Sequence, residues 1–333
     1  MKKNVKILKN TIITISALFI MLFTSCATTL NLNITRPAEL DLNGATTIAV
    51  LPFGTTGFSN VKFSGGRYPV LDFFVSIMHD DPEQREFVNY MHKTLEYDFA
   101  GSNYLKLVNS DAVKAAIDRG NNSPADVYVT GKLDSFHSEI KHDTRKVKKG
   151  EKTVVEDVYY RKANYTFQYQ IVDGNTSQVY YSSSFYGSST SDEYDDKKSV
   201  PSELAMFKEN IESEMASIVR KVQPYNVNKS IVLMKDKSKN PDMEEANRLA
   251  KNGAISQSRE LFESVYESTG LFEAGYNAAA ILEAQGKYDE AKELAEELVQ
   301  KTGHKKAIRL LDDINYENSM NEKLKKQNEA RSK

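Results

Sequence analysis

A single cysteine limits how this chain can stabilise a fold. Cys26 is the only cysteine among 333 residues, so no disulfide can form within the chain and its folded regions must be held by core packing. Hydrophobic residues make up 40% of the sequence, which is enough for a substantial core, and the length suggests about two domains. The position of the cysteine is also informative, because it closes the first apolar segment of the chain.

Residues 1–25 have the pattern of a signal peptide. A lysine-rich start is followed by an almost wholly apolar run from Ile12 to Phe23, which is short for a helix that spans a bilayer. The small residues before Cys26 resemble a lipobox, the motif at which lipoprotein signal peptidase cleaves. This resemblance implies that Cys26 becomes the acylated first residue, and more than one acyl chain gives stable anchoring. An ordinary signal peptide with an incidental cysteine is the alternative.

The residues after Cys26 and the net charge indicate where the mature chain resides. Ala27 and Thr28 follow the cysteine, without the Asp that resembles an inner-membrane retention signal. We therefore expect an outer-membrane anchor and a body that faces the periplasm. Removing residues 1–25 removes four lysines and no acid, so the formal charge moves from −2 to −6. A mildly acidic protein is a poor candidate for binding nucleic acid.

Residues 44–235 show the pattern of an α/β domain, preceded by a lipid anchor and linker at residues 26–43. Short β-branched and aromatic runs predict strands near residues 46–53, 104–108, 125–140, 154–172 and 178–186. Apolar residues at helical spacing predict helices near residues 81–100, 110–119 and 202–222. Asp81 and Ser110 are the expected caps. The order indicates an α+β fold, a mixed sheet with packed helices.

Several stretches of this domain are similar to the landmarks of one superfamily of bacterial lipoproteins. They are Arg36–Glu39, Thr47–Phe53, Asp126–Leu133 and Ile171–Asp173. The superfamily contains the curli secretion lipoprotein CsgG, the penicillin-binding-protein activator LpoB and the TolB N-terminal domain. The resemblance implies a CsgG/LpoB-like fold for residues 44–235.

The functions of these relatives differ, so several hypotheses follow from the resemblance. The first is a non-catalytic, lipid-anchored scaffold that binds proteins during envelope assembly. The alternative is an activator of peptidoglycan synthesis that acts through a penicillin-binding protein. A secretion channel is disfavoured, because it needs hairpins with an apolar face toward lipid. The candidate segments, residues 137–162 and 180–195, are charged or polar on both faces.

A basic cluster surrounds Gly150, where the pattern predicts the tip of a long β-hairpin. It comprises Lys141, Arg145, Lys146, Lys148, Lys149 and Lys152. One interpretation is a solvated turn. In the other, Lys146, Lys148 and Lys149 contact an acidic partner or an anionic lipid surface, where each basic residue contributes about 1 kcal/mol.

Residues 240–315 contain an internal repeat. Gly253 and Gly286 are 33 residues apart, and several apolar positions match at the same shift. The second copy, Tyr276–Ala291, resembles the tetratricopeptide repeat, which implies a small all-α domain of two repeats with a protein-binding surface. Tyr276 and Tyr288 are the candidate contact residues, and a plain helical bundle is the alternative. Residues 316–333 carry few apolar side chains and are predicted to form a disordered tail.

The search for catalytic and metal-binding motifs finds none. The five histidines form no HExxH motif, and no GxSxG, Walker or GxGxxG motif occurs. His137 and His142 would face opposite sides of a strand, so a shared metal is not expected. His79–Asp81 is interpreted as a loop and helix cap. We therefore expect no enzyme activity, no metal and no cofactor. The expected partners are the membrane, through Cys26, and an envelope protein, with a homo-oligomer as a further hypothesis.

Overall fold

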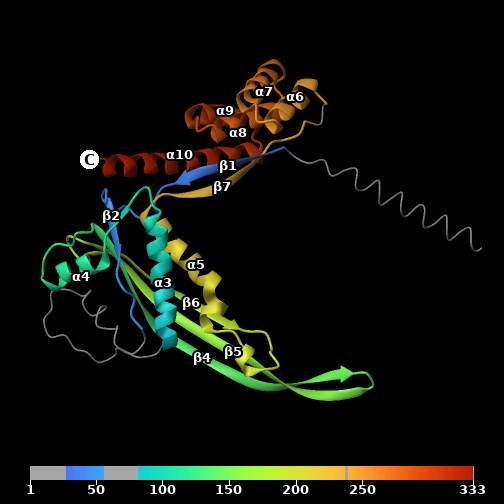
Figure 1. Ribbon diagram of the computed structural model, residues 1–333. Helices are drawn as coiled ribbons and strands as arrows, with labels where there is room; N and C mark the ends of the chain where they lie inside the picture. The colour runs from blue at the N-terminus through green and yellow to red at the C-terminus, as the bar shows by residue number, and fades with distance from the viewer. Residues whose placement is uncertain (1–27, 56–81, 237–238, 333) are drawn as a thin grey trace, which may run out of the picture. The chain divides into compact units, whose positions relative to one another are not determined.

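The computed structural model describes residues 28–55, 82–236 and 239–332. The chain forms two compact units (Figure 1). Of the described residues, those within 37–225 and 324–332 form what we call the sheet unit, and those within 28–36 and 226–323 form what we call the helical unit. The predicted α+β class, with a helical C-terminal region, is confirmed.

The sheet unit is built on a five-stranded mixed sheet with the strand order β3-β2-β4-β5-β6. Its central strand β4 is parallel to β2 and antiparallel to β5, and β5 is antiparallel to β6. The strands are β2 (Thr47–Val50), β3 (Lys106–Leu107), β4 (Val127–Lys149), β5 (Lys152–Asp173) and β6 (Val179–Thr190). Pairing of β4 with β5 continues to Lys149 and Lys152, so the predicted long hairpin and its tip at Gly150 are confirmed.

Helices cover both faces of this sheet. The helices α3 (Pro82–Ala100) and α5 (Glu203–Val222) share one hydrophobic core with the sheet. The short helix α4 (Ser110–Asp118) packs on the opposite face through Val113. Consecutive residues near β2 alternate between the two cores: Ile48 and Val50 belong to the first, and Ala49 and Leu51 to the second. This alternation is the two-residue period of a strand that is buried on both sides.

Five helices follow in the helical unit. They are α6 (Pro241–Lys251), α7 (Ile255–Thr269), α8 (Phe272–Ala284), α9 (Tyr288–Thr302) and α10 (Lys305–Arg331). Gly270 and Gly303 end α7 and α9 in the left-handed conformation, with φ of 68° and 59°, which costs a glycine little. These equivalent ends are 33 residues apart, as the repeat requires. The region of the repeat is thus helical, and the tetratricopeptide assignment itself stays a prediction.

A two-stranded ribbon completes the helical unit. The strand β1 (Thr29–Arg36) pairs with β7 (Tyr225–Val232). The predicted linker at residues 26–43 is therefore wrong for Thr29–Arg36, which forms a strand. Leu30, Leu32 and Ile34 alternate with polar residues, and Leu30 is buried in the core of the helical unit. The apolar side chains of this strand thus pack against helices more than two hundred residues away in the sequence.

Two further expectations need correction. The predicted disordered tail at residues 316–333 is helical, because α10 continues to Arg331. Its buried polar side chains, Glu317 and Gln327, hold it to strand and loop segments. The cap of α4 is Asn109 rather than Ser110, and α5 is capped by Ser202. Asp81 lies outside the described residues.

Candidate functional site

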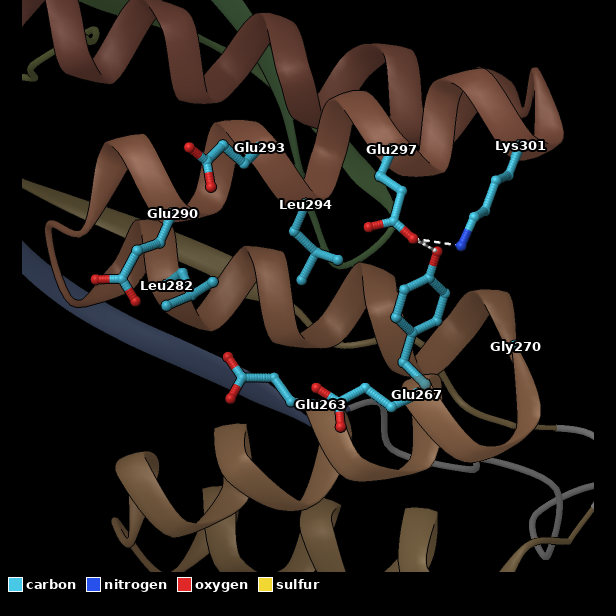
Figure 2. A pocket seen from close by; sticks show the side chains of 10 residues that line it. Glu263, Glu267, Gly270, Leu282, Glu290, Glu293, Leu294, Glu297 and Lys301 are labelled. Carbon is cyan, nitrogen blue, oxygen red and sulfur yellow. Dashed lines mark hydrogen bonds and ion pairs between the residues drawn. The ribbon is translucent and has the colours of Figure 1, made fainter.

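An acidic groove runs between α7 and α9 of the helical unit. It has a volume of about 550 Å³ and is lined by five glutamates, one lysine, Tyr266, Gly270 and two leucines. Figure 2 shows Glu290, Leu294 and Glu297 on α9 across from Glu263 and Glu267 on α7. Leu282, which belongs to α8 and is buried, lies at the base. The groove thus combines an apolar base with an acidic rim.

Charges at one end of the groove are fixed by local pairing. The Tyr266 hydroxyl donates to Glu297 Oε1 over 3.0 Å, and Lys301 Nζ donates to the same oxygen (Figure 2). The hydrogen bond from Lys301 holds the pKa of Glu297 below its usual range. The Lys301 ammonium also lies 5.4 Å from the centre of the Tyr266 ring. This end of the groove is therefore closer to neutral.

The remaining carboxylates give the groove its negative charge. Glu263 is paired with Arg259 at 3.0 Å, and Glu290 with Lys287 at 3.2 Å. Glu267 and Glu293 have no ion-pair partner among the residues that the structure describes. Unpaired carboxylates on a groove rim favour a cationic ligand.

The opposite surface of the helical unit, formed by α6, α8 and α10, is occupied by the chain itself. Leu30, Ile231 and Leu233 from the ribbon and its extension share a core with these helices. Asn277 of α8, which is fully buried, accepts from the Met234 main-chain N–H at 2.6 Å and donates to its carbonyl at 2.8 Å. An amide side chain thus holds one peptide unit of the chain as it would hold a bound peptide.

Two buried glutamates and two partly buried cations form a charge network in the same unit. Arg36 of β1 donates to both oxygens of Glu317 at 2.5 and 2.7 Å. Lys229 of β7 donates to Glu317 at 2.8 Å and also pairs with Glu283. Burial raises the pKa of Glu283 despite Lys229. Burial acts the same way on Glu317, but its two cations outweigh it and lower the pKa. The network joins both strands to α8 and α10.

The two tyrosines predicted to bind a partner lie near this network rather than in the acidic groove. Tyr276 is half-buried, and burial raises its pKa. Tyr288 is also half-buried; burial, followed by the charges of Glu317 and Glu283, raises its pKa. Both side chains therefore contribute to the surface that the ribbon covers. Their role in binding another protein stays a prediction.

The hairpin tip separates the three predicted contact lysines. Lys146 and Lys148 lie on one face of the hairpin, opposite Val155 and Thr153 in the register, and are exposed. Lys149 lies on the other face, where its ammonium is 2.7 Å from Glu156. The structure therefore brings together two of the three lysines.

Other expected features are either outside the described residues or absent from them. Cys26 lies outside this part of the chain. Within residues 28–55, 82–236 and 239–332, no cluster of three or more His, Cys, Asp or Glu could hold a metal ion. Over the same residues, no helix has the length and hydropathy needed to cross a membrane.

The sequence interpretation missed the acidic groove. The sequence does contain a helical spacing of acidic residues. Glu263 and Glu267 are four residues apart, and Glu290, Glu293 and Glu297 follow one another at intervals of three and four residues. This spacing places each set on one face of its helix. Such stripes are usually solvated, and only the packing of α7 beside α9 makes them the rim of one groove.

Comparison with known proteins gives structural likenesses at low identity. No family model and no curated protein match the chain. The PelC dodecamer from Paraburkholderia phytofirmans is 10% identical with a TM-score of 0.28, covering 59% of this chain and 98% of that one. The hypothetical protein CT253 from Chlamydia trachomatis is 10% identical with a TM-score of 0.26, covering 53% and 96%. The lipoprotein GNA1162 from Neisseria meningitidis is 9% identical with a TM-score of 0.22, covering 53% and 97%.

Proposed function

We propose that this chain is a lipid-anchored scaffold of the bacterial cell envelope, which faces the periplasm and binds a basic segment of a partner protein in its acidic groove. The groove is the observation that carries the proposal. Its volume of about 550 Å³ and its five glutamates suit lysine or arginine side chains, whose apolar stems can pack on the two leucines. The work of the protein is binding rather than catalysis.

The occupied surface of the helical unit supports this choice of site. The ribbon and Met234 fill the face of α6, α8 and α10, so a partner would have to displace several buried contacts to bind there. The groove between α7 and α9 needs no such displacement. Its unpaired carboxylates, Glu267 and Glu293, also attract a basic partner over a distance.

Charge reversal in the groove tests the proposal. We expect Glu267→Lys with Glu293→Lys to weaken capture of the native partner by at least about tenfold, since charge complementarity controls encounter and affinity. The matched control is Glu260→Lys with Glu296→Lys, which makes the same charge change on the same helices outside the groove lining. Crosslinking in native cells, followed by quantitative mass spectrometry, measures the captured partner. Equal loss in both variants would exclude the groove.

The identity of the captured protein separates the alternatives. A penicillin-binding protein that is lost with the groove variant would favour an activator of peptidoglycan synthesis. Another envelope protein would favour the general scaffold. A secretion channel stays disfavoured by the charged and polar hairpin segments.

The lipid anchor has its own test. Cys26 is the only cysteine, so Cys26→Ala should abolish incorporation of labelled palmitate and leave the precursor uncleaved. Continued labelling of this variant would remove the lipoprotein proposal and leave the groove proposal untouched.

A further inference from the structure

The strand β6 forms one edge of the five-stranded sheet and lacks the usual protection of an edge. Its twelve residues, VYYSSSFYGSST, contain neither a charge nor a proline. Native edges are commonly blocked by lysine, proline or short length, because unpaired main-chain groups invite another strand. An edge of this length and composition is therefore suited to pairing.

A hydrogen bond just after β6 shows which main-chain groups face the open edge. The Ser191 N–H donates to the Arg161 carbonyl at 2.9 Å, one residue beyond the pair Lys162 and Thr190. Antiparallel neighbours alternate between hydrogen-bonded and non-hydrogen-bonded pairs. Odd-numbered residues of β6 therefore bond to β5, and even-numbered residues present their N–H and C=O groups to the edge. These residues are Ser182, Ser184, Tyr186, Ser188 and Thr190.

These outward groups are available for pairing. None of the five residues has a main-chain hydrogen bond to another residue in the described part of the chain. Their side chains are all exposed, and Tyr186 is 68% exposed. Below this strand, Gly187 leaves room for the Tyr165 ring: a Cβ there would lie 2.2 Å from that ring. The strand β6 thus packs closely on Tyr165, while the main-chain groups at its outer edge have no partner in the described part of the chain.

We propose that β6 pairs in antiparallel orientation with β6 of a second copy of this chain, and that the two sheets become one continuous sheet. The self-complementary sequence supports a second copy as the partner. In the register centred on Tyr186, Ser182 faces Thr190 and Ser184 faces Ser188 of the other copy. All five outward residues then pair, with about ten hydrogen bonds, two for each pair.

Charge and side-chain contacts favour the same arrangement. No charged residue enters the pairing, so no like charges face each other across the strands. The acidic segment after β6, with Asp192, Glu193, Asp195 and Asp196, lies at opposite ends of the two antiparallel strands. A parallel pairing would bring the two acidic segments together. At the centre, the two exposed Tyr186 rings contact each other, a pair that stabilises neighbouring strands.

Single cysteines test the register in the full-length chain in its native membrane. The two Tyr186 Cα atoms would be about 5.5 Å apart, within the range for a disulfide, so Tyr186→Cys should give a covalent dimer on oxidation. Two Ser182 residues would be about 27 Å apart along the strands, so Ser182→Cys alone should not crosslink. Coexpressed Ser182→Cys and Thr190→Cys chains should crosslink to each other. The wild-type chain, with its own Cys26, gives the background.

Proline at an outward position tests the hydrogen bonds themselves. Ser184→Pro removes one edge donor from each copy but no bond to β5, a placement that edge strands tolerate. We expect dimerisation in detergent, measured by sedimentation, to weaken at least about tenfold, while Ser184→Ala keeps it. If Ser184→Pro fails to fold, the cysteine series decides alone.

The outcomes that would overturn this proposal are distinct. They are a wild-type monomer at all concentrations, absence of Tyr186→Cys dimers above background, or equal crosslinking by Ser182→Cys alone. The groove variant Glu267→Lys with Glu293→Lys should leave the Tyr186→Cys dimer intact, so failure of one proposal does not affect the other.

Discussion

At the scale of single residues, Glu214 couples the stability of the sheet unit to pH. It accepts a hydrogen bond from the Tyr165 hydroxyl at 2.8 Å, and its second oxygen is buried without a partner among the described residues. Burial raises the pKa of its carboxyl to about 7 from 4.5, and the tyrosine only partly opposes this. Because the folded pKa lies above the unfolded one, the stability contribution is full below pH 4.5 and falls as pH rises through 7.

Glu214→Gln should remove this pH dependence. We expect the free energy of unfolding at pH 8 to rise by about 1–2 kcal/mol after discounting the shift for solvent screening, with little change at pH 4. Denaturant unfolding at both pH values measures it. The control is Glu209→Gln, an exposed position on the same helix. An equal effect at both pH values would show that packing, rather than ionisation, is responsible.

Asn277 holds the chain segment that follows β7. Asn277→Ala removes both hydrogen bonds to Met234 and leaves a buried peptide unit unsatisfied. We expect the helical unit to lose about 2–3 kcal/mol, seen as faster hydrogen exchange in β1, β7 and α8. The sheet unit should keep its protection. Asn315→Ala, on an exposed position of α10, should change neither unit.

At the scale of elements, the structure differs from the sequence prediction at the end of α10, which is helical. Gln327 accepts from the Ala38 N–H at 2.9 Å and donates to the Ala38 carbonyl at 3.0 Å. Glu317 holds Arg36 and Lys229. A chain that ends after Tyr316 should therefore lose about 3 kcal/mol in the helical unit, where two partly buried cations lose a shared partner.

Thermal unfolding and hydrogen exchange measure this loss, which should be greatest in β1 and β7, with added exchange near Ala38. A chain that ends after Arg331 should match the full chain. Unchanged stability after the larger truncation would show that the end of α10 does not stabilise the helical unit.

The elements differ in how well the sequence predicts them, and the reason is where each finds its partners. The helix stripes of α3 and α5, with Phe87 and Phe207, are readable because apolar spacing reports burial directly. The strand β1 had the alternation of Leu30 and Leu32, but a short isolated run resembles a linker until its distant partner is known. The end of α10 is held by buried polar contacts, which hydrophobic periodicity does not report. The acidic groove depends on how two helices pack, which no local pattern shows.

At the scale of the whole molecule, neither unit is one continuous stretch of chain. The helical unit takes β1 from the N-terminal side, and the sheet unit takes Leu324–Lys333 from the C-terminal side. Separately expressed polypeptides of residues 1–225 and 226–333 should therefore associate. The first contains β1, which belongs to the helical unit, and the second contains Leu324–Lys333, which belongs to the sheet unit. Copurification through a tag on one polypeptide measures this.

A substitution in β1 tests the basis of this association. Leu30→Asp would place a charge in the core of the helical unit, which is costly, and should reduce copurification at least about tenfold. Asn33→Asp, on an exposed position of the same strand, is the control. Lack of association between the wild-type polypeptides would show that the units tolerate loss of these segments.

The early start of β1 has a consequence for where this protein can act. The Thr28 carbonyl already accepts from the Leu233 N–H at 2.8 Å, so the fold begins two residues after the proposed lipid on Cys26. Two residues extend at most about 7 Å, whereas a free tether through residue 43 would extend about 60 Å. With the lipid in the bilayer, the helical unit stays within one headgroup layer's distance of the membrane surface. On the proposed function, the helical unit would stay close to the membrane surface instead of reaching across the periplasm, and its partners would be proteins that present a basic segment at that surface.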